Sequence, residues 1–153
     1  MSRQDGFSLV ELMIVVLIVA ILIAVAVPTF LGQRVTAQDR AAQSALRNGL
    51  VAEKSVMAGR FSFTDDVTEL QAVEPSFLFV ASLSPPVGQI GVAVNGTDVV
   101  CMAVQSQSGT WFGIWDAVQD ATAFGRSDTA AALFGGSCPL SPPASPAWAG
   151  NGW

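Results

Sequence analysis

The sequence predicts an α+β protein in which a long N-terminal helix covers a small antiparallel β-sheet head with a disulfide-closed C-terminal loop. Three observations support this fold class. An apolar run extends over Phe7–Val27, and an apolar pattern with helical period continues over Gln33–Met57. Beyond these, alternating apolar segments flank Asn95-Gly96, a dipeptide typical of tight β-hairpin turns.

The apolar run has the length of a membrane-spanning helix. Every residue from Leu12 to Val27 is apolar, and the span that begins at Phe7 is about 31 Å long as a helix, enough to cross a bilayer. Glu11 interrupts it one turn after Phe7. A charged side chain near bilayer depth costs roughly 2.5–3.5 kcal/mol on insertion scales, so this acid requires a partner or a function.

The start of the run carries a specific motif. Gly6-Phe7-Ser8-Leu9-Val10-Glu11, followed by an apolar helix, resembles the class III signal segment of type IV pilins and pseudopilins. The resemblance implies that a membrane peptidase cuts between Gly6 and Phe7 and methylates the new amine of Phe7. It also implies that Glu11, the fifth residue of the mature chain, guides subunit assembly.

The resemblance covers roughly residues 1–32 and includes Pro28, which lies where pilins commonly carry a helix-interrupting proline. Proline removes one backbone hydrogen bond and clashes with the carbonyl of Ala24, four residues earlier. In a bilayer or a packed filament we therefore expect the helix to continue past Pro28 with a kink or a locally melted segment that reaches toward Gly32. The alternative is that Pro28 ends the membrane helix at the interface.

Two other interpretations of the apolar run remain. A secretory signal peptide cleaved after Ala24-Val25-Ala26 would release the chain at Val27, but the leader is weakly charged, because Asp5 offsets Arg3. A plain single-pass anchor fits the length and leaves Glu11 unexplained.

Beyond the run, the helix is expected to be amphipathic. Its apolar stripe comprises Val35, Ala42, Leu46, Leu50 and Met57. A second, basic stripe comprises Arg40, Arg47 and Lys54, with Arg34 close to the same line. The basic stripe is either a solvated helix face or a surface that meets acids of a neighbouring subunit.

The segment after the helix is expected to hold a short second helix. The first helix should end before Gly59, which is placed as the residue after the C-cap. Asp66 and Glu69 have the spacing of a capping box and predict a helix that runs to about Val73. Asp65 beside Asp66 also suggests calcium binding or general acid chemistry, but no third ligand converges on them, so capping is favoured.

The head is expected to contain a sheet of three or four strands. The candidate strands are residues 77–81, 89–94, 97–105 and 110–118. In the last of these, alternation places Trp111, Gly113 and Trp115 on one face and Phe112 and Ile114 on the other.

Two cysteines, Cys101 and Cys138, most simply form one disulfide in an exported chain, and two reduced buried thiols are the alternative. The resemblance agrees, because many pilins close a C-terminal loop onto the sheet in this way. The proline-rich stretch 139–153 is expected to be extended or disordered, with Trp148 and Trp153 folded back on the head or on a neighbour.

These patterns divide the chain into five segments: a leader (1–6), a transmembrane or filament-core helix (7–32), an amphipathic helix half (33–58), a β-rich head (59–138) and a proline-rich tail (139–153). The chain has no histidine and no nucleotide-binding glycine motif. We therefore expect no enzyme activity, no cofactor and no metal site.

The resemblance implies a structural subunit of a type IV pilus, in which Glu11 pairs with the amine of Phe7 on a neighbouring subunit. An intrasubunit pair of the same two residues is the competing arrangement. A pseudopilin of a type II secretion or DNA-uptake machine is the first alternative function, and a membrane-tethered binding domain that never polymerises is the second.

The expected partners are copies of the chain itself, the prepilin peptidase and methyltransferase, the pilus assembly platform and membrane lipid. A net charge of −5 gives no support to DNA as a partner. The expected location is the cytoplasmic membrane before assembly and a cell-surface filament afterwards.

Overall fold

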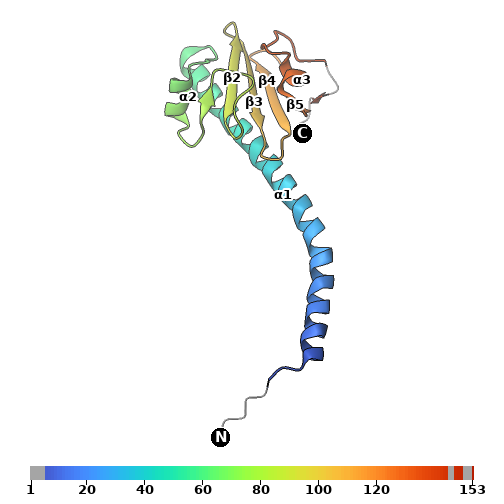
Figure 1. The fold of residues 1–153 in the computed structure, drawn as a ribbon. Coiled ribbons are helices and arrows are strands. Elements are labelled where there is room, and N and C mark those ends of the chain that lie inside the picture. Colours follow the sequence, from blue (N-terminus) through green and yellow to red (C-terminus); the bar gives the residue numbers. More distant parts are fainter. Residues whose placement is uncertain (1–5, 145–146, 150–152) are drawn as a thin grey trace. The chain divides into compact units, whose positions relative to one another are not determined.

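A computed structural model describes residues 6–144, 147–149 and 153 of the chain. Contacts between residues divide the chain into two compact units, residues 1–36 and 37–153. Helix α1 (Leu9–Arg60) begins in the first unit and ends in the second (Figure 1). The prediction of a long N-terminal helix that continues past Pro28 is confirmed.

The second unit contains a six-stranded sheet whose spatial order, β1 to β6, is the order of the strands in the chain. The strands are β1 (Phe79–Val80), β2 (Ile90–Asn95), β3 (Val99–Gln105), β4 (Trp111–Ala117), β5 (Ala123–Ser127) and β6 (Trp148–Ala149). β1 is parallel to β2, and all other neighbouring strands are antiparallel. The α+β fold class is confirmed, but the expected count of three or four strands is wrong, because β5 and β6 are short and carry few strand-forming residues.

The C-terminal half of α1 covers one face of the sheet. Leu46 and Leu50 are buried there against Ile90, Phe112 and other apolar side chains of β2, β3 and β4. The closest approach is at Gly49, where an added Cβ would lie 2.7 Å from the Met102 side chain. A larger residue at this position would therefore displace the end of the Met102 side chain and crowd Ile90.

The opposite face of the sheet is also buried, under helix α3 (Ala130–Phe134) and the segment around Cys138. Trp115 is fully buried on this face, whereas Phe112 and Ile114 belong to the core under α1, as the predicted alternation requires. The sheet thus lies between two apolar layers.

The end of α1 differs from the sequence-based expectation. The helix includes Gly59 and ends at Arg60, and Phe61 takes the left-handed conformation with φ 58°. The guanidinium of Arg60 pairs with the carboxylate of Glu69 on α2 (Val67–Val73), which favours the extra helical residues. Asp66 caps α2, since its carboxylate accepts a hydrogen bond of 2.9 Å from the Thr68 N–H.

The predicted disulfide is present. It joins Cys101 of β3 to Cys138 after α3, with a Cα–Cα distance of 5.5 Å. The Asn95 amide also donates to the carbonyl of Cys138 at 2.8 Å, and the Trp115 indole N–H donates to the carbonyl of Pro139 at 2.8 Å. These bonds fix the C-terminal loop on the outer face of the sheet.

Both tail tryptophans fold back on the head, which is one of the two arrangements that the sequence left open for them. Trp148 lies in β6, and its indole N–H donates to the carbonyl of Leu133 at 3.1 Å. The Trp153 ring meets Phe112 and Phe124 edge to face, with centroid distances of 5.6 and 5.0 Å. Proline content therefore did not indicate how these two large aromatic rings are buried.

The N-terminal helix as a candidate assembly site

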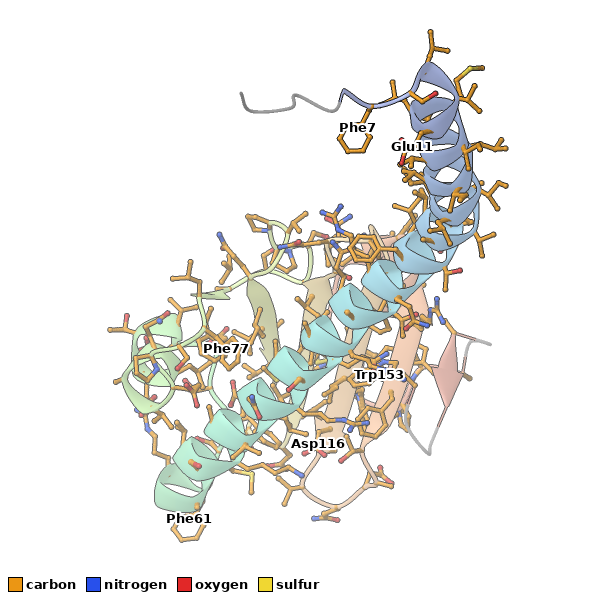
Figure 2. The ribbon with its side chains drawn as sticks, turned by 90° about the horizontal axis from the view of Figure 1, so that it is seen from below. Phe7, Glu11, Phe61, Phe77, Asp116 and Trp153 are labelled. Atoms are coloured by element: carbon orange, nitrogen blue, oxygen red, sulfur yellow. A yellow bond between two sulfur atoms is a disulfide. The ribbon has the colours of Figure 1, made fainter. Side chains whose placement is uncertain are left out.

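The motif residues lie just before α1 and in its first turn. Gly6, Phe7 and Ser8 precede the helix, which begins at Leu9, and Glu11 lies in its first turn (Figure 2). Ser8 and Glu11 have the spacing of a capping box. Glu11 is thus placed where the partial positive charge of a helix N-terminus favours an acid.

The helix starts two residues later than the sequence predicted, so Phe7 does not form a helical turn with Glu11. The Phe7 side chain is 85% exposed, and the Phe7 nitrogen is an uncharged peptide amide in the uncut chain. The Phe7 nitrogen would therefore become a positively charged amine only if the chain were cut between Gly6 and Phe7.

Following Glu11, α1 displays a fully exposed apolar surface. All side chains from Leu12 to Val27 are exposed within the chain, and they include leucine, isoleucine, valine and methionine on every side of the helix. By length and composition, α1 contains a segment able to cross a membrane. An exposed apolar surface of this extent is unfavourable in water and is typical of helices that contact lipid or other apolar helices.

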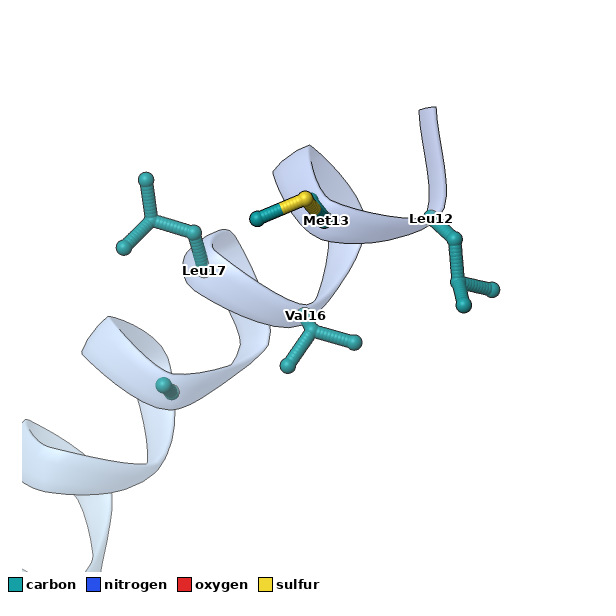
Figure 3. A pocket seen from close by; sticks show the side chains of 5 residues that line it. Leu12, Met13, Val16 and Leu17 are labelled. Carbon is teal, nitrogen blue, oxygen red and sulfur yellow. The ribbon is translucent and has the colours of Figure 1, made fainter. Parts of the chain in front are cut away.

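This surface contains a shallow apolar hollow one turn after Glu11. It has a volume of about 380 Å³ and is lined by Leu12, Met13, Val16, Leu17 and Ala20 (Figure 3). The hollow exists because the side chain of Ala20 is smaller than those of the neighbouring residues. An apolar knob from another helix would fit against such a hollow, as ridges fit grooves in packed helices.

Pro28 lies inside α1, and the helix continues on both sides of it. The carbonyl of Ala24 loses the N–H donor that a non-proline residue would supply. One residue further, the hydroxyl of Thr29 donates to the carbonyl of Val25 at 3.2 Å, which supplements the backbone bonds of this turn. The kink or melted segment expected near Pro28 stays a prediction.

The basic stripe is partly used within the chain. Lys54 donates to the buried carboxylate of Asp116 at 3.2 Å, and the Arg47 guanidinium lies 5.3 Å from the Trp153 ring centroid. Neither sequence-based interpretation of the stripe foresaw these contacts. Arg40 and Arg34 remain exposed, without an ion pair in the described part of the chain.

One titratable residue escaped the sequence analysis. Glu53 is fully buried beneath the loop that leads to α2, where its Oε2 accepts a hydrogen bond of 3.3 Å from the Thr64 N–H. Burial raises the pKa of this carboxyl to about 7; the Thr64 bond opposes the shift, and the charges of Asp65 and Glu69 add to it. Its three-residue spacing from Leu50, on the buried face, is the signal that could have identified it.

Comparisons with known proteins agree with the N-terminal motif. Residues 1–27 match the family model described as the prokaryotic N-terminal methylation motif. The chain is also similar to the type IV major pilin protein PilA of Myxococcus xanthus (strain DK1622), with 35% identity over 68 residues. No solved structure matches the chain significantly.

The similarity is partial. The aligned residues make up 44% of this chain, and they span 31% of the length of the pilin. The N-terminal segment of the chain thus carries the prokaryotic N-terminal methylation motif, at the start of a long helix whose C-terminal half covers a disulfide-bonded sheet, and part of the chain is similar to a type IV major pilin.

Proposed function

We propose that the chain is a structural subunit of a type IV pilus that polymerises through its N-terminal helix after removal of a six-residue leader. The observation that carries this proposal is the exposed apolar helix from Leu12 to Val27, preceded by one acid. A surface of this kind is stable in a bilayer and in a bundle of identical helices, and not in water.

The proposed order of events begins in the cytoplasmic membrane, with the leader on the cytoplasmic side and the head outside. A prepilin peptidase cuts between Gly6 and Phe7 and methylates the new amine of Phe7. The helices of cleaved subunits then leave the lipid and bury one another in the filament core, which supplies most of the cohesion.

Glu11 sets the axial register of this bundle. The new Phe7 amine is positive, and Glu11 of a neighbouring subunit is the natural counter-charge in an apolar surrounding. A buried ion pair that loses one member costs about 3–5 kcal/mol, because the remaining charge stays desolvated. Only a stagger that joins amine to carboxylate avoids this cost at every subunit.

The experiment compares the wild-type chain with Glu11→Ala and Glu11→Gln in cells that assemble it. We expect both variants to be inserted and cleaved as the wild type is, and to yield few or no sheared filaments. Normal filament yield from either variant would refute the register role.

A second experiment tests cleavage of the leader. Gly6→Phe is expected to leave uncleaved precursor in the membrane, and the mature wild-type chain is expected to begin at N-methylated Phe7 by mass spectrometry. A mature chain that begins at Val27, or that retains residues 1–6, would overturn the processing step. Filaments that stay short and cell-bound while secretion or DNA uptake depends on them would favour the pseudopilin alternative.

A further inference from the structure

The head carries opposite charge on two opposite flanks. At one flank, Arg47 of α1 lies over the Phe124 ring of β5, Arg126 of β5 lies over the Phe112 ring of β4, and Arg40 precedes Arg47 on the same face of α1; we call these three arginines the basic flank. At the other, Asp65, Asp66 and Glu74 surround α2, which packs beside β1; we call this the acidic flank. Because strand order runs from β1 to β6, the flanks lie at opposite sides of the sheet (Figure 1).

The basic flank combines cations with aromatic rings. The Arg47 guanidinium lies 5.7 Å from the Phe124 ring centroid, and that of Arg126 lies 6.0 Å from the Phe112 centroid. Arg40 precedes Arg47 by seven residues, within about 20° of two full helical turns, so both lie on one face of α1. These rings orient the guanidiniums without neutralising them.

Two acids near the basic flank lower its net positive charge, but neither forms an ion pair with its arginines in the described part of the chain. Asp39, next to Arg40, accepts a hydrogen bond of 2.5 Å from the Ser108 hydroxyl of the β3–β4 turn. Asp128 follows β5 and is exposed. The only ion pairs within the described residues, Lys54–Asp116 and Arg60–Glu69, leave all three arginines of the basic flank unpaired.

The acidic flank contains a surface hollow suited to an arginine side chain. The hollow has a volume of about 230 Å³ and lies between α1 and the end of α2. Its walls include the exposed apolar side chains of Val51 and Val73, and Glu74 lines it too. An arginine stem packs well on such an apolar wall while its guanidinium reaches a carboxylate.

We propose that the basic flank of one copy docks on the acidic flank of the next copy, an inference that rests on the proposed filament function. Two different, complementary patches on one chain produce a head-to-tail contact, which repeats indefinitely when the rotation does not close a ring. Single exposed ion pairs are weak, but complementary patches fix orientation and exclude wrong registers. The flanks therefore set the angular placement of heads, while the helices supply cohesion.

Nucleic acid is the other polyanion that a basic, aromatic flank would attract. Three arginines on a head of acidic overall composition make a small footprint for it, whereas the acidic flank matches them on every neighbouring copy. The charges therefore favour a second copy of the chain as the partner of the basic flank.

The test uses charge reversal in the full chain, with sheared filament yield as the readout. Arg40→Glu with Arg126→Glu, or Asp65→Lys with Glu74→Lys, should each lower the yield about tenfold or more. All four substitutions in one chain restore complementarity and should return the yield to near the wild-type value. Arg40→Gln with Arg126→Gln should give a smaller loss in the same direction.

The matched control restores net charge without restoring the contact. Asp98 and Asp120 lie in turns outside both flanks, so Asp98→Lys with Asp120→Lys should not rescue the reversed basic flank. Each variant is checked for its disulfide and for wild-type abundance in the membrane.

The possible outcomes separate this inference from the proposed function. If the wild-type chain forms no filaments, the proposed function itself fails. If wild type and reversed variants assemble equally, or if the control rescues as well as the four-residue swap, the docking is wrong. Loss of binding to a duplex DNA fragment with normal assembly would assign the basic flank to nucleic acid instead.

Discussion

Replacing Glu53 with glutamine should remove a pH dependence that this buried acid builds into the head. The carboxyl lies fully inside the core, and its Oε1 has no hydrogen-bond partner among the residues that the structure describes. Loss of water raises its pKa from 4.5 to about 7. Glutamine preserves the size of the group and an oxygen that can accept from the Thr64 N–H, so Glu53→Gln imitates the protonated acid.

The direction in which the free energy of unfolding changes with pH follows from proton binding. The folded chain holds the Glu53 proton more tightly than the unfolded chain, so the contribution of Glu53 to stability is greatest below pH 4.5, declines as pH rises toward about 7, and is constant above that. The displacement from 4.5 to about 7 corresponds to a decline of roughly 3 kcal/mol in the free energy of unfolding. Glu53→Gln should lack this decline and be the more stable protein near neutral pH and above.

The assay is urea unfolding of the full chain in detergent micelles with the disulfide intact, followed by tryptophan fluorescence, to which the buried Trp115 contributes. Unfolding free energies are compared across the range from pH 4.5 to about 7. Glu74→Gln is the matched control, because Glu74 is only half-buried and should leave the pH profile unchanged. Parallel profiles for the wild type and Glu53→Gln would show that the reasoning is wrong.

Three further changes have expected outcomes. Cys101→Ser with Cys138→Ser should lower the free energy of unfolding by about 4 kcal/mol, the chain-entropy value for the loop between them, as measured by denaturant unfolding. Lys54→Met should destabilise the head, because the Asp116 carboxylate, 3% exposed, loses its cation; thermal unfolding should show a loss of about 1–3 kcal/mol, and a wild-type melting temperature would contradict this. Gly91→Ala should reduce the amount of folded protein, since the new Cβ would lie 2.0 Å from a backbone oxygen; an unchanged yield would show that the neighbouring segment moves aside freely.

The periodicity of apolar residues predicted which face of a helix or strand is buried. It did not predict contacts between residues that are far apart in the chain. The periodicity correctly placed Leu46 and Leu50 on the buried face of α1, but Val35, on the same stripe, is exposed. A period identifies a face of a helix and not the turns that are covered. Glu53 lies on that buried face and was overlooked, because a charged residue is ordinarily assigned to the surface.

Long-range contacts explain the other differences. Lys54 and Asp116 are 62 residues apart, so no local pattern joins them. The tail was judged from its prolines, yet the burial of Trp153 depends on rings in β4 and β5. The roles proposed for Gly6 and Glu11 concern contacts with a peptidase and with other subunits, which the fold of a single chain does not display.

The sequential strand order has a consequence for folding. Each strand lies beside its predecessor in the chain, so strands can be added in turn, and most steps close only a short loop; the connection from Ser127 of β5 to Trp148 of β6 is the longest. Trp153 packs on the rings of Phe112 and Phe124 at the last residue of the sequence, after all the strands are in place. A chain shortened just before that tryptophan is therefore expected to leave part of these rings exposed, which limited proteolysis would reveal as faster cleavage of the head.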